Sequence, residues 1–192
     1  MSRNKSYSNE VVLEKAMNAF WRYGYEATSV RMLEKEMGIN QFSIYASFQS
    51  KKNLFIQAIQ NYREYVKRYR FRILLQEDAG IAELENFLLK AVSSKIPDDD
   101  SKGCLVVNTA GEVGNKDSDI AHEINKYYEF IRGMLKNMIR NAIKKGEIPS
   151  ETDIEKQANF FLGVMQSISV ASKTMDKNQI EDFIAVSLKQ IK

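Results

Sequence analysis

The sequence predicts an all-α protein of about nine helices, with a small helix-turn-helix head before a larger helical part. Apolar residues recur at helical spacing along most of the 192 residues, and no stretch shows strand-like alternation. Gly and Pro number only 9 and 2, so helix-breaking positions are few. Small polar residues able to cap helices precede several of the apolar repeats. Together these observations favour helices joined by short turns.

The first helix is expected over residues 9–23, where apolar residues follow helical spacing, Ser8 can cap the start and Gly24 can end the helix. Thr28 or Ser29 can cap a second helix of about eight residues.

Gly38 tolerates the positive φ of a tight turn after this second helix. A third short helix is expected from about Asn40 to Ala46. We expect Ile39, Ile44 and Phe48 to form the core of the head together with Phe20, Leu33 and Leu54.

The later helices follow the same signals. Ser50 and Asp117 can cap two of them, Thr152 and Glu155 have capping-box spacing, and the polar segment 97–103 is a break. The expected ranges are 51–75, 81–95, 104–114, 117–145, 152–173 and 178–192.

Several functional classes are disfavoured. No apolar run approaches the roughly 20 residues that span a bilayer, so we expect a cytoplasmic protein without a membrane partner. Cys104 and His122 are the single Cys and His, which disfavours a disulfide, a metal site or a cofactor. No catalytic motif occurs, so we do not expect an enzyme. Cys104 can serve redox sensing only if its thiolate is stabilised, and Lys102 is the only nearby cation in sequence.

A helix, a glycine-containing turn and another short helix form a unit whose second helix can enter the major groove of DNA. Gln41, Phe42 and Ser43 begin that helix and are candidates to read base edges, and Arg31 can contact a guanine or a phosphate. The alternative is that each of them is an ordinary exposed polar or aromatic residue.

Other residues of the head are candidates for phosphate contacts. Hydroxyl groups are supplied by Tyr45, Ser47, Thr28 and Ser29, although the last two can be plain helix caps. Lys51 and Lys52 open the fourth helix, where free backbone N–H groups favour an anion. Two solvated lysines are the alternative. The formal net charge of +3 does not decide the matter.

The stretch FWRYGYEATSVRMLEKEMGINQFSIYASFQSKKNLF resembles the N-terminal signature of tetracycline-repressor (TetR) type regulators. The matching residues are Phe20, Gly24, Tyr25, Thr28, Ser29, Val30, Leu33, Gly38, Ile39, Ile44, Tyr45, Phe48, Lys51, Leu54 and Phe55. The resemblance implies a DNA-binding domain over residues 6–66, with the helix-turn-helix at about 29–48. Residues 67–192 would form a ligand-binding and dimerisation domain. The resemblance also implies an Ω-shaped homodimer whose two heads occupy successive major grooves of DNA. Binding of a ligand usually releases such a homodimer from its DNA.

The recognition segment departs from that family. Many members have Ser-Lys-Gly-Ser/Thr-Leu-Tyr-x-His-Phe, whereas residues 40–48 read Asn-Gln-Phe-Ser-Ile-Tyr-Ala-Ser-Phe. The Lys and His of that pattern are missing, while Gln41 offers an amide able to read adenine and Phe42 a ring able to touch a thymine methyl. The operator therefore cannot be copied from relatives.

Residues 154–171 have two apolar faces, so this helix needs two neighbours. One neighbour would be the chain's own core and the other its symmetry mate, giving a four-helix interface with the last helix. The candidate interface residues are Phe160, Val164, Ser167, Ala171, Phe183 and Ile184. A monomer with a fully internal helix is the alternative.

The ligand-site candidates lie on helices that surround pockets in similar proteins: Phe71, Phe87, Cys104, Asn108, Tyr127, Tyr128 and Phe161. Each can instead be plain core. A buried Asn108 needs a partner, which can be an effector or a backbone carbonyl.

The sequence leads to the hypothesis of a homodimeric repressor that binds a pseudo-palindromic double-stranded operator and is released by a small apolar or aromatic effector. The alternative is a helical DNA-binding or protein-interaction module without an effector pocket.

Overall fold

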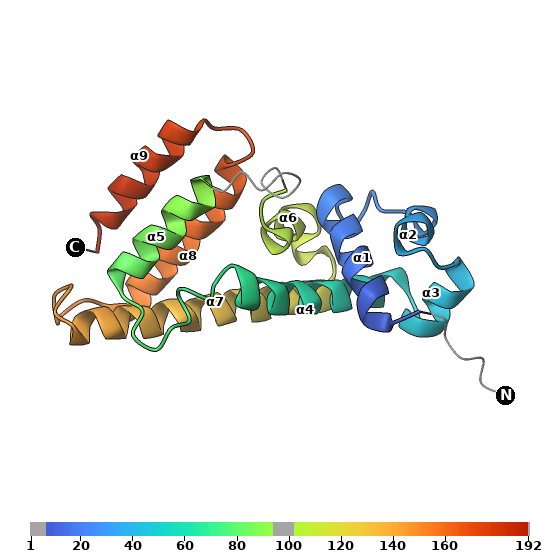
Figure 1. Ribbon diagram of the computed structural model, residues 1–192, viewed down its shortest axis with the longest axis horizontal. Helices are drawn as coiled ribbons and strands as arrows, with labels where there is room; N and C mark the ends of the chain where they lie inside the picture. Colours follow the sequence, from blue (N-terminus) through green and yellow to red (C-terminus); the bar gives the residue numbers. More distant parts are fainter. Residues whose placement is uncertain (1–6, 94–101, 192) are drawn as a thin grey trace.

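The computed structural model describes residues 7–93 and 102–191, and the regular structure of these residues is entirely helical. It has nine α-helices and one short 3-10 helix in the described ranges, which confirms the predicted fold class. Figure 1 shows α1, α2 and α3 at one end of an elongated molecule and α5, α8 and α9 at the other. We call α1–α3 the head and α5–α9 the body, and α4 runs from one to the other.

The first three helices lie close to their predicted bounds. They are α1 (Asn9–Tyr23), α2 (Val30–Met37) and α3 (Gln41–Phe48). Ser29 caps α2, with its hydroxyl accepting from Met32 N at 3.2 Å, and Asn40 caps α3. Both helices therefore begin where a side-chain oxygen satisfies a free backbone N–H.

The fourth helix, α4 (Lys51–Tyr69), starts as predicted after its cap Ser50 but ends before the expected Leu75. Residues 70–75 form turns, in which Phe71 N donates to Val66 O at 2.7 Å. The turns bury Phe71 and Leu74 against the body. Burial of these two apolar side chains stabilises the turns in place of the helix that was expected here.

The expected head core is confirmed. Phe20 is fully buried, and its ring lies edge-on to that of Phe55 at 4.8 Å between centroids, while Tyr25 stacks on Phe55 at 4.6 Å. The predicted members Phe20, Leu33, Ile44, Phe48 and Leu54 are all buried, and Ile39 packs against them while partly exposed.

The body contains the remaining helices: α5 (Ile81–Ser93), α6 (Leu105–Glu112), the 3-10 helix (Gly114–Lys116), α7 (Ser118–Lys144), α8 (Ile154–Ala171) and α9 (Lys177–Leu188). The predicted end of the fifth helix and most of the predicted break lie outside the described residues. The prediction of one helix over 104–114 was too long, because Gly114 adopts a positive φ of 49° and starts the 3-10 turn.

The expected capping box of α8 is wrong. Asp153, rather than Thr152, caps this helix, and its carboxylate accepts from Lys156 N at 3.1 Å. The Thr152 hydroxyl instead donates to Pro149 O at 2.7 Å and closes the preceding turn. A capping box does form at α9, between Asp176 and Gln179.

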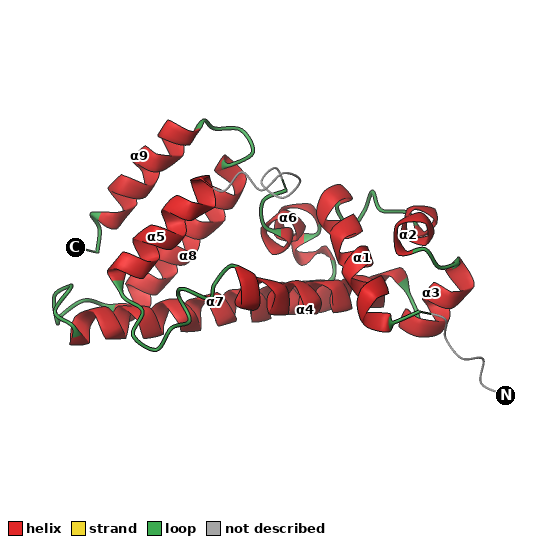
Figure 2. Cartoon of the chain, viewed as in Figure 1, coloured by secondary structure: helices red, strands yellow, loops and turns green. Residues whose placement is uncertain are grey.

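The long helix α7 connects the two ends of the molecule. It packs against α8 and against α4, and α9 in turn packs against α5 and α8. Figure 2 shows the same all-helical arrangement with loops only at the helix ends. No helix of the described residues is long and apolar enough to cross a membrane.

Phe20→Ala should lower the free energy of unfolding by about 3–5 kcal/mol, because it removes a fully buried ring and leaves a cavity. Tyr23→Ala on the same helix, where the side chain is 39% exposed, should cost less than about 1 kcal/mol. Urea denaturation at one fixed protein concentration measures both variants. Equal losses would contradict this assignment of the head core.

Candidate DNA-binding interface and ligand cavity

The turn between α2 and α3 is fixed by backbone and side-chain hydrogen bonds. Gly38 has the left-handed φ of 72°, and its N–H donates to Glu34 O. The Glu34 carboxylate accepts the N–H of Gln41, and the Asn40 side chain accepts Ser43 N at 2.8 Å. The first turn of α3 therefore has a defined direction relative to α2.

The outer face of α3 is polar and aromatic. Gln41, Phe42 and Tyr45 are exposed, Phe42 to 83%, while Ile44 and Phe48 point into the core. On α2, Arg31 is exposed, as is the cap Ser29. The outer face of α3 therefore presents one amide and two aromatic side chains to solvent.

Tyr7 contacts α3 from the chain before α1, a contact that the sequence reasoning missed. Its hydroxyl is hydrogen-bonded to Ser47 Oγ at 2.9 Å and donates to Ser43 O at 3.4 Å. Ser47 and Ser43 are thus partly buried beneath Tyr7. Because Tyr7 lies outside every periodic segment, the pattern of the sequence contains no signal for this contact.

Thr28 is a correction to the predicted set of DNA contacts. Its side chain is fully buried, and its hydroxyl donates to Gly24 O at 2.5 Å. The hydroxyl joins the end of α1 to the start of α2 from inside the head. It cannot reach a phosphate, so Ser29 alone keeps the dual role of cap and surface hydroxyl.

Lys51 lies beside the loop that joins α1 to α2. Its Nζ is 4.6 Å from the centroid of the Tyr25 ring and donates to Glu26 O at 3.4 Å. Partial burial lowers the pKa of Lys51 and raises that of Tyr25. The ring holds the ammonium group near the start of α4, where free N–H groups also favour an anion.

Lys52 is a second correction, because it is directed toward the body and not toward the outer face. Its Nζ lies 2.6 Å from Asp119 Oδ2 and 3.4 Å from Asp117 Oδ2. The hydrogen bond to Asp119 raises the pKa of Lys52, and the backbone hydrogen bond from Ile120 lowers that of Asp117. The two aspartates belong to the start of α7, which the sequence could not place beside α4.

Two further contacts join head and body. The Glu112 carboxylate at the end of α6 accepts Tyr25 N at 2.9 Å and Glu26 N at 2.7 Å. Trp21 of α1 donates from Nε1 to Gly103 O at 3.0 Å, just before α6 begins. Both ends of α6 are therefore attached to the head.

A cavity of about 910 Å³ lies between α4, α5, α6, α7 and α8. Five of the predicted ligand residues line it: Phe71, Phe87, Cys104, Tyr127 and Tyr128. The sequence reasoning missed four aromatic lining residues, namely Trp21, Tyr62, Tyr65 and Tyr69. Three of these are on α4 at spacings of three and four residues, which place them on one side of the helix. That spacing is visible in the sequence, but it does not show which helices this side faces.

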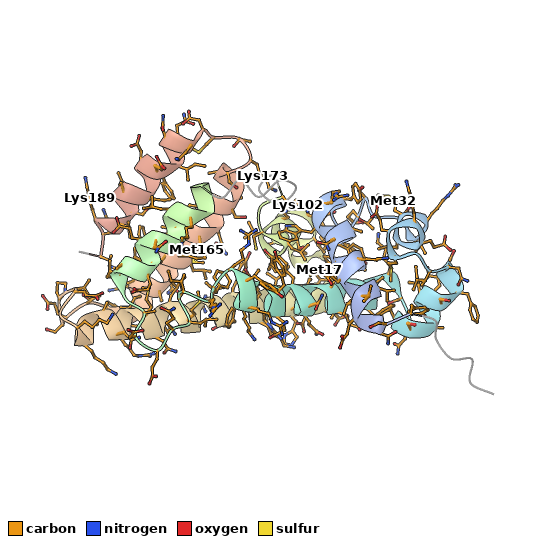
Figure 3. All side chains as sticks on the ribbon, in the orientation of Figure 1. Met17, Met32, Lys102, Met165, Lys173 and Lys189 are labelled. Carbon is orange, nitrogen blue, oxygen red and sulfur yellow. The ribbon has the colours of Figure 1, made fainter. Side chains whose placement is uncertain are left out.

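Asn108 and Phe161 do not line the cavity. Asn108 Nδ2 donates to Lys102 O at 2.7 Å, and its Oδ1 accepts from Lys173 Nζ, so this amide is satisfied by the protein; both lysines are labelled in Figure 3. Phe161 is fully buried and lies edge-on to Phe160 at 5.2 Å. It is therefore a core residue.

Three phenols of the cavity, those of Tyr62, Tyr127 and Tyr128, have pKa values raised by burial. Burial raises the pKa of Tyr128 to about 12 and raises the pKa values of Tyr62 and Tyr127 well above the usual range. Cys104 Sγ lies 3.6 Å from the Tyr127 hydroxyl. Among the described residues no group of His, Cys, Asp and Glu is arranged to hold a metal ion.

The predicted dimer residues fall into two groups. Phe160, Ser167 and Phe183 are exposed, and Ala171 is partly exposed, whereas Val164 and Ile184 are already buried within the single chain. Val164 and Ile184 thus support the faces of α8 and α9 from inside. Two other exposed residues extend the same faces: Val170 and Val186, which are 55% and 57% exposed.

Comparison with known proteins covers both parts of the chain. Residues 12–58 match the family described as bacterial regulatory proteins, tetR family, and residues 80–186 match the tetracyclin repressor-like C-terminal domain. The chain is 27% identical over 191 residues to the uncharacterized HTH-type transcriptional regulator YezE of Bacillus subtilis, with 98% of each protein covered. It is 24% identical over 172 residues to the HTH-type transcriptional repressor ComR of Escherichia coli, with 89% of this chain and 82% of ComR covered.

Solved structures agree with these matches. The TetR family regulator CifR, as a cysteine mutant complexed with 26 bp double-strand operator DNA, has a TM-score of 0.86 and 25% identity, with 99% of this chain and 100% of that chain covered. A TetR family regulator from Agrobacterium tumefaciens shares the fold, with a TM-score of 0.79 at 18% identity and 95% and 96% of the two chains covered. These relatives are regulators and not enzymes, and this chain belongs to the TetR family of transcriptional regulators.

Proposed function

We propose that the protein is a repressor that binds a pseudo-palindromic operator as a homodimer and leaves it when a small molecule occupies the cavity. The supporting observation is that the wall of the cavity is hydrogen-bonded to the head at both ends of α6, through Trp21 and Glu112. Residues 6–66 serve as the DNA-binding domain and residues 67–192 as the ligand-binding and dimerisation domain. Such a regulator acts in the cytoplasm, where it meets chromosomal DNA.

The proposed base contacts come from the start of α3. Gln41 can hydrogen-bond to an adenine and Phe42 can contact a thymine methyl group, with Ser43 behind them. Arg31 reaches either a guanine or a phosphate. This assignment is supported by the exposure of the Gln41 and Phe42 side chains on the outer face of α3.

The proposed phosphate contacts flank that face. Ser29, Tyr45 and Lys51 are candidates, since each has a donor at or near the surface of the head. Ser47 remains a weaker candidate because its hydroxyl is hydrogen-bonded to Tyr7. Such contacts fix the register of a protein on DNA without reading sequence.

The proposed dimer interface uses the outer faces of α8 and α9. Phe160 and Val170 on α8, with Phe183 and Val186 on α9, expose apolar surface, and Ser167 and Ala171 lie between them. Two copies related by a twofold axis would bury these faces as a four-helix bundle. The interface fixes the distance between the two heads.

Effector release requires that the ligand binds more tightly to the form that does not fit DNA. Cys104 and Val107 of the cavity wall lie at the start of α6, and Glu112 at its end holds the backbone amides of Tyr25 and Glu26. A ligand that displaces α6 would therefore displace the loop that leads into Ser29 and α2. The size of the cavity supports this proposal over a regulator or module without an effector pocket.

Gln41→Ala should weaken operator binding by about 1–3 kcal/mol and relax the preference at one base pair. Lys51→Ala should weaken binding to all sequences and reduce the salt dependence by about one phosphate contact. Footprinting on the DNA upstream of the protein's own gene, at several salt concentrations, separates the two effects. If neither substitution changed binding, the assignment of the DNA-binding face would be wrong.

Phe160→Asp should raise the dimer dissociation constant about a hundredfold or more, because each dimer would bury two unpaired carboxylates. Leu75→Asp is the matched control, since Leu75 is 44% exposed and lies outside α8 and α9. Analytical ultracentrifugation measures the dissociation constants. Unchanged sedimentation of the Phe160 variant would count against this interface.

Trp21 is the single tryptophan of the chain and lines the cavity, so a bound ligand should change its fluorescence directly. A compound that alters this emission should also lower the affinity for operator DNA, by about 5–150-fold if the coupling is typical. Operator DNA should lower the affinity for that compound by the same factor. Ligands that fill the cavity without any effect on DNA binding would contradict the proposed release.

A further inference from the structure

The cavity wall has one sign of charge. Arg70 and Lys90 are the charged side chains among its described lining residues, and no Asp or Glu occurs in that lining. The other polar groups there are neutral, and include the Tyr128 phenol, the Gln166 amide and the Ser169 hydroxyl. Charges at this wall attract a ligand group of opposite sign and repel one of the same sign. The wall therefore favours a ligand with negative charge over one with positive charge.

Arg70 lies where α4 ends. It is the C-terminal cap of α4, and its backbone N–H donates to the carbonyl oxygen of Val66 at 2.9 Å. The positive charge of Arg70 acts on the cavity wall, since it lowers the pKa of Tyr62 against the larger rise caused by burial. Arg70 and Lys90 each make another interaction within the chain. An anion would thus be an additional partner, which the five N–H donors of an arginine allow.

The rest of the wall is suited to a ring that carries acceptor oxygens. Trp21, Tyr62, Tyr65, Phe71 and Phe87 offer aromatic surface against which a planar ligand can pack. Burial raises the pKa values of Tyr62, Tyr127 and Tyr128, so these phenols can donate hydrogen bonds to the oxygens of a carboxylate or sulfonate. A cationic aromatic ligand would gain ring contacts but would meet two like charges.

We propose that the effector is an aromatic anion, such as an aryl carboxylate or sulfonate, whose rings pack among the aromatic side chains of the cavity and whose anionic oxygens lie beside Arg70. This inference rests on the proposed function, because it assumes that the cavity is a ligand site.

Two fluorescent probes with the same ring systems test the charge preference on the intact dimer. Anilinonaphthalene sulfonate has the anionic group, and N-phenylnaphthylamine lacks it. The sulfonate should bind about tenfold tighter, and its advantage should shrink as salt is added. Energy transfer from Trp21, the single tryptophan, shows that a probe is bound to the protein, and competition between the two probes shows that they share one site.

Substitutions identify the residue responsible. Arg70→Gln should weaken the binding of the sulfonate about tenfold and leave N-phenylnaphthylamine within about twofold, while Arg70→Lys should restore part of the loss. Arg72→Gln is the matched control, because Arg72 is exposed two residues away and does not line the cavity. It should change neither affinity.

Three results would overturn the inference: equal affinity for the two probes, failure of the sulfonate to transfer energy from Trp21, or an Arg70→Gln variant that binds the sulfonate normally. Operator binding is measured separately, with and without the probe. If the sulfonate binds through Arg70 but leaves DNA affinity unchanged, the inference holds and this compound does not support effector release. If a neutral or cationic compound binds in the cavity and releases DNA, effector release holds and the inference is wrong.

Discussion

The structure depends on the burial of one continuous face of α4. This helix of 19 residues is about 28 Å long, and it belongs to the head at its start and to the body at its end. Leu54, Phe55 and Ala58 complete the core against α1, and Tyr62 and Val66 continue the same face into the cavity wall. Because a straight helix transmits its orientation along its whole length, the direction of the head relative to the body is set by this packing.

Polar contacts fix the same junction more finely. Lys52 pairs with Asp117 and Asp119, Glu112 holds the amides of Tyr25 and Glu26, and Trp21 bonds to Gly103. Exposed ion pairs such as those of Lys52 contribute little stability, generally under about 1 kcal/mol. Their effect is on orientation, because each of these contacts forms only in one relative position of the head and the body. These directional contacts thus add orientation to a junction that the packing of α4 already holds together.

The residues next to the cavity make their hydrogen bonds and packing contacts within the protein, and their side chains leave the cavity unfilled. The Asn108 amide lies between Lys102 and Lys173, the Cys104 amide donates to Ser169 Oγ at 2.8 Å, and Phe161 packs in the core behind the wall. Gly103 has a φ of 65°, and a side chain there would come within 2.8 Å of Ser169 O. The loop before α6 therefore packs closely against α8.

The sequence by itself determined the helices, most of their caps, the core of the head and the family, because these follow from apolar spacing, capping residues and a signature that lie within short stretches of the chain. Ser29, Ser50 and Asp117 cap the helices that their positions predict, and Phe20 and Leu33 are buried as their spacing requires. Only the tertiary structure decided that Lys52 faces α7, that Thr28 is buried and that Trp21 lines the cavity. These facts depend on residues about 65 to 82 positions apart or on which face of a helix meets its neighbour, and no local periodicity encodes either.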